Sequence, residues 1–166
     1  MEYTELLEKQ IIGRLKVDNP WWTEGVIPEY YSKMTPRMYL DIFYPLVRDM
    51  GLRRAMILMG PRRVGKTVML FHTIGRLIAE GVSPQNIIYI SVETPIYNKI
   101  ALEQLFTLSK QILGKSGSTS EEFWVMFDEI QYLKNWELHL KSLVDTYRNV
   151  KFVASGSAAA ELKKRS

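Results

Sequence analysis

A glycine loop between two apolar runs constrains this chain more than any other feature. The stretch reads Ala-Met-Ile-Leu-Met-Gly-Pro-Arg-Arg-Val-Gly-Lys-Thr-Val-Met-Leu over residues 55–70. Residues 60–67 fit G-x-x-x-x-G-K-[ST], in which glycines let backbone N–H groups wrap phosphate oxygens without a Cβ in the way. The apolar run before the loop predicts a buried strand, and the run after it predicts an amphipathic helix. We therefore expect a strand, a phosphate-binding loop and a helix, in that order.

The loop predicts a nucleotide site with magnesium. Lys66 is expected to reach the β- and γ-phosphates, and the hydroxyl of Thr67 to coordinate Mg²⁺. The following helix points its partly positive N-terminus at the anion. The side chains of Arg62 and Arg63 are expected to face solvent or a carboxylate, with a neighbouring subunit or nucleic acid as the alternative. The residues expected to bind nucleotide here are Gly60, Pro61, Arg62, Arg63, Val64, Gly65, Lys66, Thr67 and Val68.

A second motif ends another apolar run with two carboxylates. The sequence Phe-Trp-Val-Met-Phe-Asp-Glu spans residues 123–129 and predicts a buried strand. Asp128 at its end is expected to support the Mg²⁺ shell, and Glu129 to polarise the water that attacks the γ-phosphate. The alternative is a solvated strand end with no chemistry. We expect Glu129 and Lys66 to be the catalytic residues.

Composition predicts a globular protein without disulfides. The 166 residues are 46% hydrophobic and 24% charged, and they include no cysteine. The acidic, polar start is no signal peptide, and no apolar run approaches the ~20 residues of a membrane span. We therefore expect a cytoplasmic protein with no membrane partner. The net charge of +4 is a mild basic excess that supports nucleic-acid binding only weakly.

Strands and helices alternate along the chain after the loop. Strands are expected at 86–92 and 151–154, and helices at 66–80, 99–113 and from Asn135 onward. This order predicts a mostly parallel sheet in a three-layer α/β/α P-loop NTPase fold, with the ligand at the carboxyl ends of the strands. A Ser- and Gly-rich loop at 115–120 is the best candidate for a mobile segment.

The N-terminal part is expected to be an arm, residues 1–52, attached to a core of residues 53–166. A helix is expected at 4–16, and another is expected to open at Thr35-Pro36 and to kink or end at Pro45. Between them lie Trp21, Trp22, Tyr30 and Tyr31. These aromatics have three possible uses, namely packing on the domain or a neighbour, a lid over adenine, or stacking on nucleic-acid bases.

ATP is the preferred nucleotide. GTP-binding proteins usually read the base with Asn/Thr-Lys-x-Asp, and the only Asn-Lys here, at 98–99, is followed by Ile-Ala without the aspartate. A small-molecule kinase is less favoured because such enzymes seldom keep a Glu directly after the second-motif Asp. Three functions remain open, which are an ATPase that drives a partner, a nucleotide-dependent switch without appreciable turnover, and a DNA-associated ATPase.

These motifs resemble the uncharacterised prokaryotic ATPases of the AAA+ superfamily. The resemblance rests on Gly-Pro-Arg-Arg-Val-Gly-Lys-Thr at 60–67, Phe-Asp-Glu-Ile-Gln at 127–131 and Ser-Gly-Ser at 155–157, and it covers roughly residues 53–162. It implies that Ser155 or Ser157 occupies the sensor position near the γ-phosphate. The family commonly has Asn or Thr at this position.

The resemblance also implies that the chain is incomplete at its C-terminus. Family members are longer, with a fifth strand, a helical lid and further C-terminal domains, and oligomers are possible. In the family order 5-1-4-3-2, the strand at 55–59 would then lie at a sheet edge, which is an association hazard. We expect the N-terminal arm or another chain to cover that edge. Without a lid or a neighbour's arginine, we expect slow hydrolysis.

Overall fold

A four-stranded parallel sheet forms the centre of the computed structural model, which describes residues 2–117 and 120–157. The strands are β1 (Met56–Gly60), β2 (Ile87–Ser91), β3 (Phe123–Asp128) and β4 (Val150–Ser157). Their order across the sheet is β1-β4-β3-β2, and every neighbouring pair is parallel. The carboxyl ends of all four strands therefore lie at one edge, which confirms the predicted fold class with a sheet that is wholly parallel.

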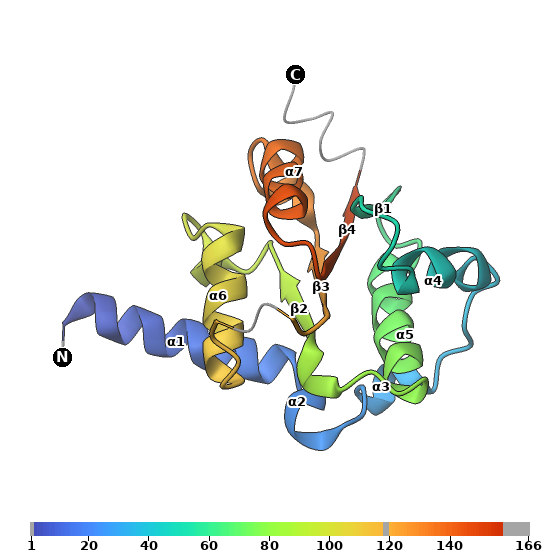
Figure 1. Cartoon of the computed structure of the whole chain (residues 1–166), viewed down its shortest axis with the longest axis horizontal. Coiled ribbons are helices and arrows are strands. Elements are labelled where there is room, and N and C mark those ends of the chain that lie inside the picture. Colours follow the sequence, from blue (N-terminus) through green and yellow to red (C-terminus); the bar gives the residue numbers. More distant parts are fainter. Residues whose placement is uncertain (1, 118–119, 158–166) are drawn as a thin grey trace.

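Helices cover both faces of the sheet, as Figure 1 shows. On one face lie α4 (Leu40–Arg48) and α5 (Lys66–Ala79), and on the other lie α6 (Leu102–Ile112) and α7 (Trp136–Thr146). The first helix, α1 (Tyr3–Asp18), crosses beside α6, and α2 (Trp21–Glu24) and α3 (Glu29–Ser32) follow it. Short 3-10 turns occupy Pro84–Asn86, Pro95–Tyr97 and Ile130–Tyr132.

The two faces of β3 show why its apolar run is continuous. Trp124 donates its indole N–H to Val47 O on α4, at 3.0 Å, on one face. Phe123 packs edge-on against Phe106 of α6 on the other face, with ring centroids 6.1 Å apart. Every residue of β3 is buried because both faces are covered, as expected for a central parallel strand.

The N-terminal arm covers the outer edge of β2. Asn19 is 1% exposed; its amide donates to Tyr89 O at 2.9 Å, and its Oδ1 accepts from Tyr89 N–H at 2.6 Å. Ile87 O accepts both indole N–H groups, from Trp21 at 2.9 Å and Trp22 at 2.7 Å. Side chains thus satisfy backbone groups that an edge strand would leave unpaired. The packing interpretation of the two tryptophans is confirmed.

The expectation that the arm covers β1 is wrong. The first part of the arm, α1 and α2, lies against β2 and α6 at the opposite side of the sheet, because Asn19 and the two indoles pair with β2. The later part, α3 and α4, packs on α5. Ile57 of β1 is 45% exposed, and Met59 is 36% exposed. Pairing of β1 with another chain stays a prediction.

Some predicted boundaries also differ. The helix expected at Thr35-Pro36 begins at Leu40, whose N–H bonds Arg37 O at 3.0 Å, and it continues past Pro45 to Arg48. Strand β4 is longer than expected and takes in residues 155–157. Part of the Ser- and Gly-rich loop, residues 118–119, lies outside the described residues. None of the helices within 2–117 and 120–157 has both the length and the apolar character to cross a membrane.

Candidate nucleotide site

The glycine loop connects β1 to α5 at the carboxyl edge of the sheet. Gly65 precedes the helix with φ +90°, a conformation that favours glycine, and its carbonyl accepts the Met69 N–H at 3.0 Å. Lys66, only 8% exposed, turns its ammonium back onto the loop and donates to Gly60 O, at 2.9 Å, and to Pro61 O. The ammonium therefore sits where the loop carbonyls hold it, at the N-terminus of α5.

The carboxylate of Asp128 is the centre of the site. It is 2% exposed and accepts three hydroxyl hydrogen bonds. Thr67 Oγ1 donates to Oδ2 at 2.8 Å, Tyr89 donates to the same oxygen at 2.6 Å, and Ser155 Oγ donates to Oδ1. A buried charge needs such partners to offset its lost hydration. The three hydroxyls come from α5, β2 and β4, so Asp128 joins both halves of the sheet to the loop.

Glu129 has a partner that the sequence reasoning did not assign. Its backbone is left-handed, with φ 56°, and its N–H donates to Ser155 Oγ at 3.2 Å. The amide of Gln131 donates to Glu129 Oε2 at 2.5 Å, while Gln131 Oε1 accepts the Ser157 N–H at 3.1 Å. Gln131 is 1% exposed. This buried amide therefore links the Glu129 carboxylate to the end of β4.

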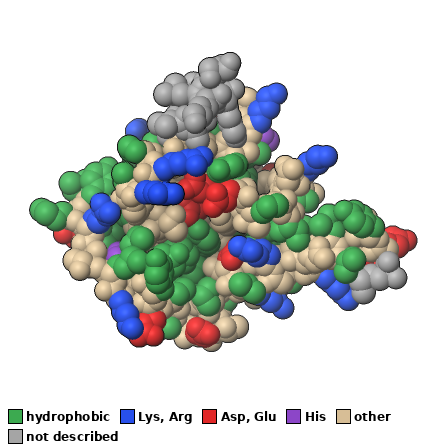
Figure 2. All heavy atoms as spheres, turned by 180° about the vertical axis from the view of Figure 1, so that it is seen from behind, with side chains coloured by type: hydrophobic (Ala, Val, Ile, Leu, Met, Phe, Trp, Pro, Cys, Tyr) green, Lys and Arg blue, Asp and Glu red, His purple; other side chains and the backbone are tan. Residues whose placement is uncertain are grey.

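The site is rich in negative charge on one side. Burial, followed by the charges of Glu129 and Asp128, raises the pKa of Glu93, and the charge of Arg62 opposes that rise. Arg62 is exposed and lies near this group. Burial and then the charge of Asp128 raise the pKa of Tyr89, which keeps its hydroxyl protonated as a donor. Figure 2 shows acidic side chains gathered beside basic ones near the middle of the rear face.

The structure brings most of the predicted residues together. Thr67, Asp128 and Ser155 meet through the contacts above, and Glu129 adjoins them through Ser155. Lys66 precedes Thr67, and its ammonium lies on the loop carbonyls. The residues predicted to bind nucleotide through the loop backbone, Gly60, Pro61, Arg62, Arg63, Val64, Gly65 and Val68, run from the end of β1 to the first turn of α5. Ser157 lies beside Gly60 across the strand pair, and within the described residues its buried hydroxyl has no hydrogen-bond partner.

These side chains suit a magnesium ion bound together with phosphates. The Thr67 hydroxyl and the Asp128 carboxylate are hard oxygen ligands, and they lie 2.8 Å apart. Mg²⁺ usually takes one or two protein ligands and completes its shell with water and substrate phosphates. No group of three or more His, Asp or Glu side chains within residues 2–117 and 120–157 is arranged to hold a metal ion alone. The donor set therefore fits Mg²⁺ only in company with a phosphate ligand.

Three functional candidates were missed from the sequence. Tyr89 lies in an apolar strand, and its hydroxyl was the only local signal. Gln131 stands two residues after Glu129, within the Asp-Glu-Ile-Gln run, but the pattern gives it no role. Arg37, from the segment between α3 and α4, lies against Gly65 of the loop. That contact depends on how the arm folds back, so no local pattern predicts it.

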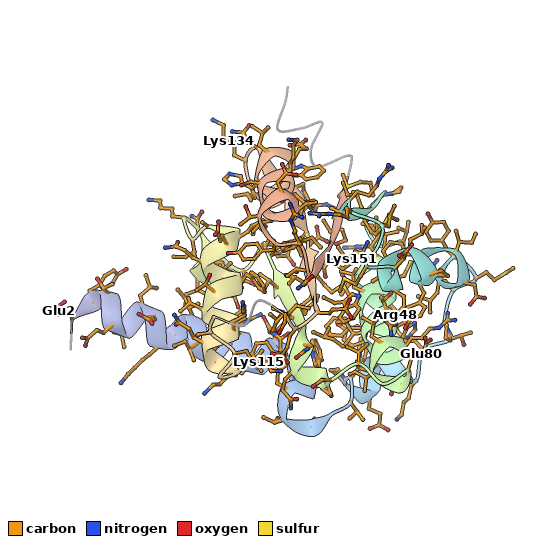
Figure 3. The ribbon with its side chains drawn as sticks, viewed as in Figure 1. Glu2, Arg48, Glu80, Lys115, Lys134 and Lys151 are labelled. Atoms are coloured by element: carbon orange, nitrogen blue, oxygen red, sulfur yellow. The ribbon has the colours of Figure 1, made fainter. Side chains whose placement is uncertain are left out.

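Other notable features lie away from the loop. A cavity of about 850 Å³ lies between part of the segment before α4 and the second half of α5, and it is lined mainly by apolar groups such as Ile27 and Leu40. Lys151, labelled in Figure 3, is 2% exposed near the amino end of β4 and donates to Leu52 O at 2.6 Å. Burial lowers the pKa of this lysine. Neither feature contacts the residues around Asp128.

The chain is similar to several known proteins. A family model described as an AAA domain matches residues 52–166. The uncharacterized protein MJ1637 of Methanocaldococcus jannaschii is 32% identical over 138 residues, which are 80% of this chain and 28% of that protein. An uncharacterized protein of Haemophilus influenzae is 30% identical over 103 residues, which are 62% of this chain and 25% of that protein.

The chain spans about a quarter of the length of these two relatives. Among solved structures, C. elegans PCH-2 is similar over 90% of this chain and 45% of its own, with a TM-score of 0.47 and 17% identity.

Proposed function

The chain belongs to the AAA domain family, and from that membership we propose that it binds ATP with Mg²⁺ at the glycine loop and hydrolyses it. The observation that carries the proposal is the hydrogen bond of 2.8 Å between Thr67 and the buried Asp128, at the N-terminus of α5. It joins the loop to the carboxylates at the end of β3. Family membership supports nucleotide binding in general, and ATP and hydrolysis are the specific parts of the proposal.

Each residue of the site has a role that follows from its side-chain chemistry. Lys66 neutralises phosphate charge, and the backbone N–H groups at the start of α5 donate to phosphate oxygens. Thr67 and Asp128 hold the metal, which when bound supplies positive charge to the phosphates. Glu129 accepts a proton from the attacking water, and Ser155 fixes Glu129 through its backbone N–H.

Binding is tested by thermal unfolding with Mg²⁺ and ATP, ADP or GTP. Ligand at about 100 times its Kd adds roughly 2.7 kcal/mol to the free energy of unfolding, so the midpoint should rise by several degrees. Lys66→Ala removes charge-assisted bonds worth roughly 1.5–3 kcal/mol and should weaken ATP about 10- to 100-fold. The exposed Lys9 of α1 offers a matched control, Lys9→Ala, which should behave as wild type. Equal midpoints with and without every nucleotide would contradict the proposal.

A second function, a nucleotide-dependent switch without appreciable turnover, has one observation in its favour. The Gln131 amide already engages Glu129 Oε2 at 2.5 Å, which reduces the freedom of that carboxylate to take a proton. Phosphate release separates the two functions. Turnover by wild type that Glu129→Gln abolishes, with ATP affinity unchanged, supports the ATPase. ATP binding by both proteins without turnover supports the switch.

A further inference from the structure

Arg37 lies on the phosphate loop although it is far from it in sequence. A Cβ placed on Gly65 would be 2.8 Å from both Nε and Nη2 of Arg37, and 3.0 Å from Cζ. Three atoms of the guanidinium group are thus almost equally close to one point of the loop. The guanidinium group therefore lies directly against Gly65, at the N-terminus of α5.

The segment that carries Arg37 is anchored to α5 on both sides. Before it, Tyr31 stacks on Phe71 with ring centroids 4.0 Å apart, and Tyr31 O contacts His72 Nε2 at 2.7 Å. After it, Asp41 pairs with Arg76 at 3.3 Å. These contacts hold both ends of the segment to the same helix that begins at the loop. They place Arg37 over Gly65.

The charge of Arg37 has no carboxylate partner within residues 2–117 and 120–157. Its side chain is exposed beside backbone N–H groups that favour an anion. Another arginine, Arg62, lies near the acidic groups of the site, where its charge lowers the pKa of Glu93. Arg37 is therefore an available guanidinium on the loop, and its fork of N–H donors matches phosphate oxygens.

We propose that Arg37 binds the phosphate chain of the nucleotide from the side of the N-terminal segment. This inference rests on the proposed function. The contact falls on Gly65 of the loop, while Glu129, the proposed base for the attack on the terminal phosphate, follows the end of β3. Arg37 is therefore a binding residue for the phosphates that ADP and ATP share. It makes the segment before the family domain part of the nucleotide site.

The test is direct calorimetric binding of ADP and of ATP, each with Mg²⁺, to the unchanged chain and four variants. Arg37→Ala should weaken both nucleotides by the same factor, about 10-fold, because it removes a charge-assisted contact. Arg37→Lys keeps the charge but loses the planar fork, so its affinity for each nucleotide should lie between those of wild type and Arg37→Ala. Arg148→Ala is the matched control, since Arg148 is exposed and follows α7 at the amino end of β4. Lys66→Ala reports on the proposed function itself.

Each outcome decides the inference. Wild-type affinity in Arg37→Ala beside weak binding in Lys66→Ala overturns the role of Arg37 and leaves the proposed function intact. Tighter binding by Arg37→Ala shows that the side chain blocks the loop, and loss of ATP affinity alone places it at the terminal phosphate. Both results overturn the inference. A wild-type chain that binds neither nucleotide overturns the inference and the proposed function together. Without nucleotide, the unfolding midpoints of the Arg37 variants should agree with that of wild type, because Arg37 is exposed.

Discussion

Gln131 decides how the carboxylate of Glu129 is held. The amide spans two groups, donating to Glu129 Oε2 and accepting from Ser157 N–H, and it is buried. We expect Gln131→Ala to lower kcat for ATP about 10- to 100-fold, because small misplacements of a reacting group are costly. KM and the measured ATP affinity should change little, since the amide is bonded to Glu129 and to the backbone N–H of Ser157 and does not belong to the glycine loop.

The control for this prediction is Gln85→Ala, which removes a partly buried amide that bonds Trp22 O away from the site. Its kcat should match wild type. A rise in kcat in Gln131→Ala would contradict the prediction and would show that Gln131 restrains Glu129. An unchanged kcat would show that the bond has no role in turnover.

The local sequence pattern predicted those site residues that belong to a short motif. Lys66, Thr67 and Asp128 follow from the types that phosphate and Mg²⁺ require at fixed spacing. Tyr89 and Arg37 could not be predicted in this way, because each acts across a contact made only when distant segments meet. The roles assigned to the motif residues stay predictions until binding is measured.

At the edge of β2, Asn19 is the side chain that pairs with Tyr89. Its amide replaces a neighbouring strand by pairing with both backbone groups of Tyr89. Asn19→Ala should lower the free energy of unfolding by about 2–5 kcal/mol, because it leaves a buried N–H and a buried C=O without partners. Urea denaturation measures the change. Thr23→Ala removes an exposed hydroxyl that bonds Pro20 O, and its stability should remain within about 0.5 kcal/mol of wild type. Similar losses in both variants would contradict the assignment.

Helices and strands with regular periodicity were predicted well, including α1 of the arm, whereas the position of the arm on the sheet was not. The periods of α5 and β3 reflect burial against one sheet, so the sequence contains the signal. The start of α4 was misplaced because Thr35-Pro36 is a good local helix signal. In the structure the helix begins only at Leu40, and the residues before it include Arg37, which contacts Gly65 of the loop. The position of the arm depends on which sheet edge its polar side chains match, and this information is spread over distant residues.

Buried tyrosines make the whole molecule sensitive to alkali. Burial, and then the charge of Glu80, raises the pKa of Tyr44 from 10.0 to about 12. Burial also raises the pKa values of Tyr89 and Tyr97. Because the folded protein holds these protons more tightly than the unfolded chain does, the stability they confer is complete below pH 10 and falls as pH rises further. We expect the unfolding midpoint to fall steadily from about pH 10 to pH 12.

Calorimetric scans at intervals of half a pH unit check this expectation. Tyr44→Phe should reduce the fall between pH 10 and pH 12, whereas Tyr30→Phe, at a residue that is 69% exposed, should not. A midpoint that stays constant through this interval would contradict the buried phenols as the cause.

The hydrogen bonds between Asn19 and Tyr89 also limit how early in synthesis the arm can pack on the sheet. The two residues are separated by 70 positions, and a ribosome adds about 5–20 residues per second. Asn19 and the tryptophans beside it therefore emerge several seconds before the strand that they cover exists. During synthesis this aromatic segment remains exposed and can associate wrongly, and the end of that exposure coincides with the arrival of β2.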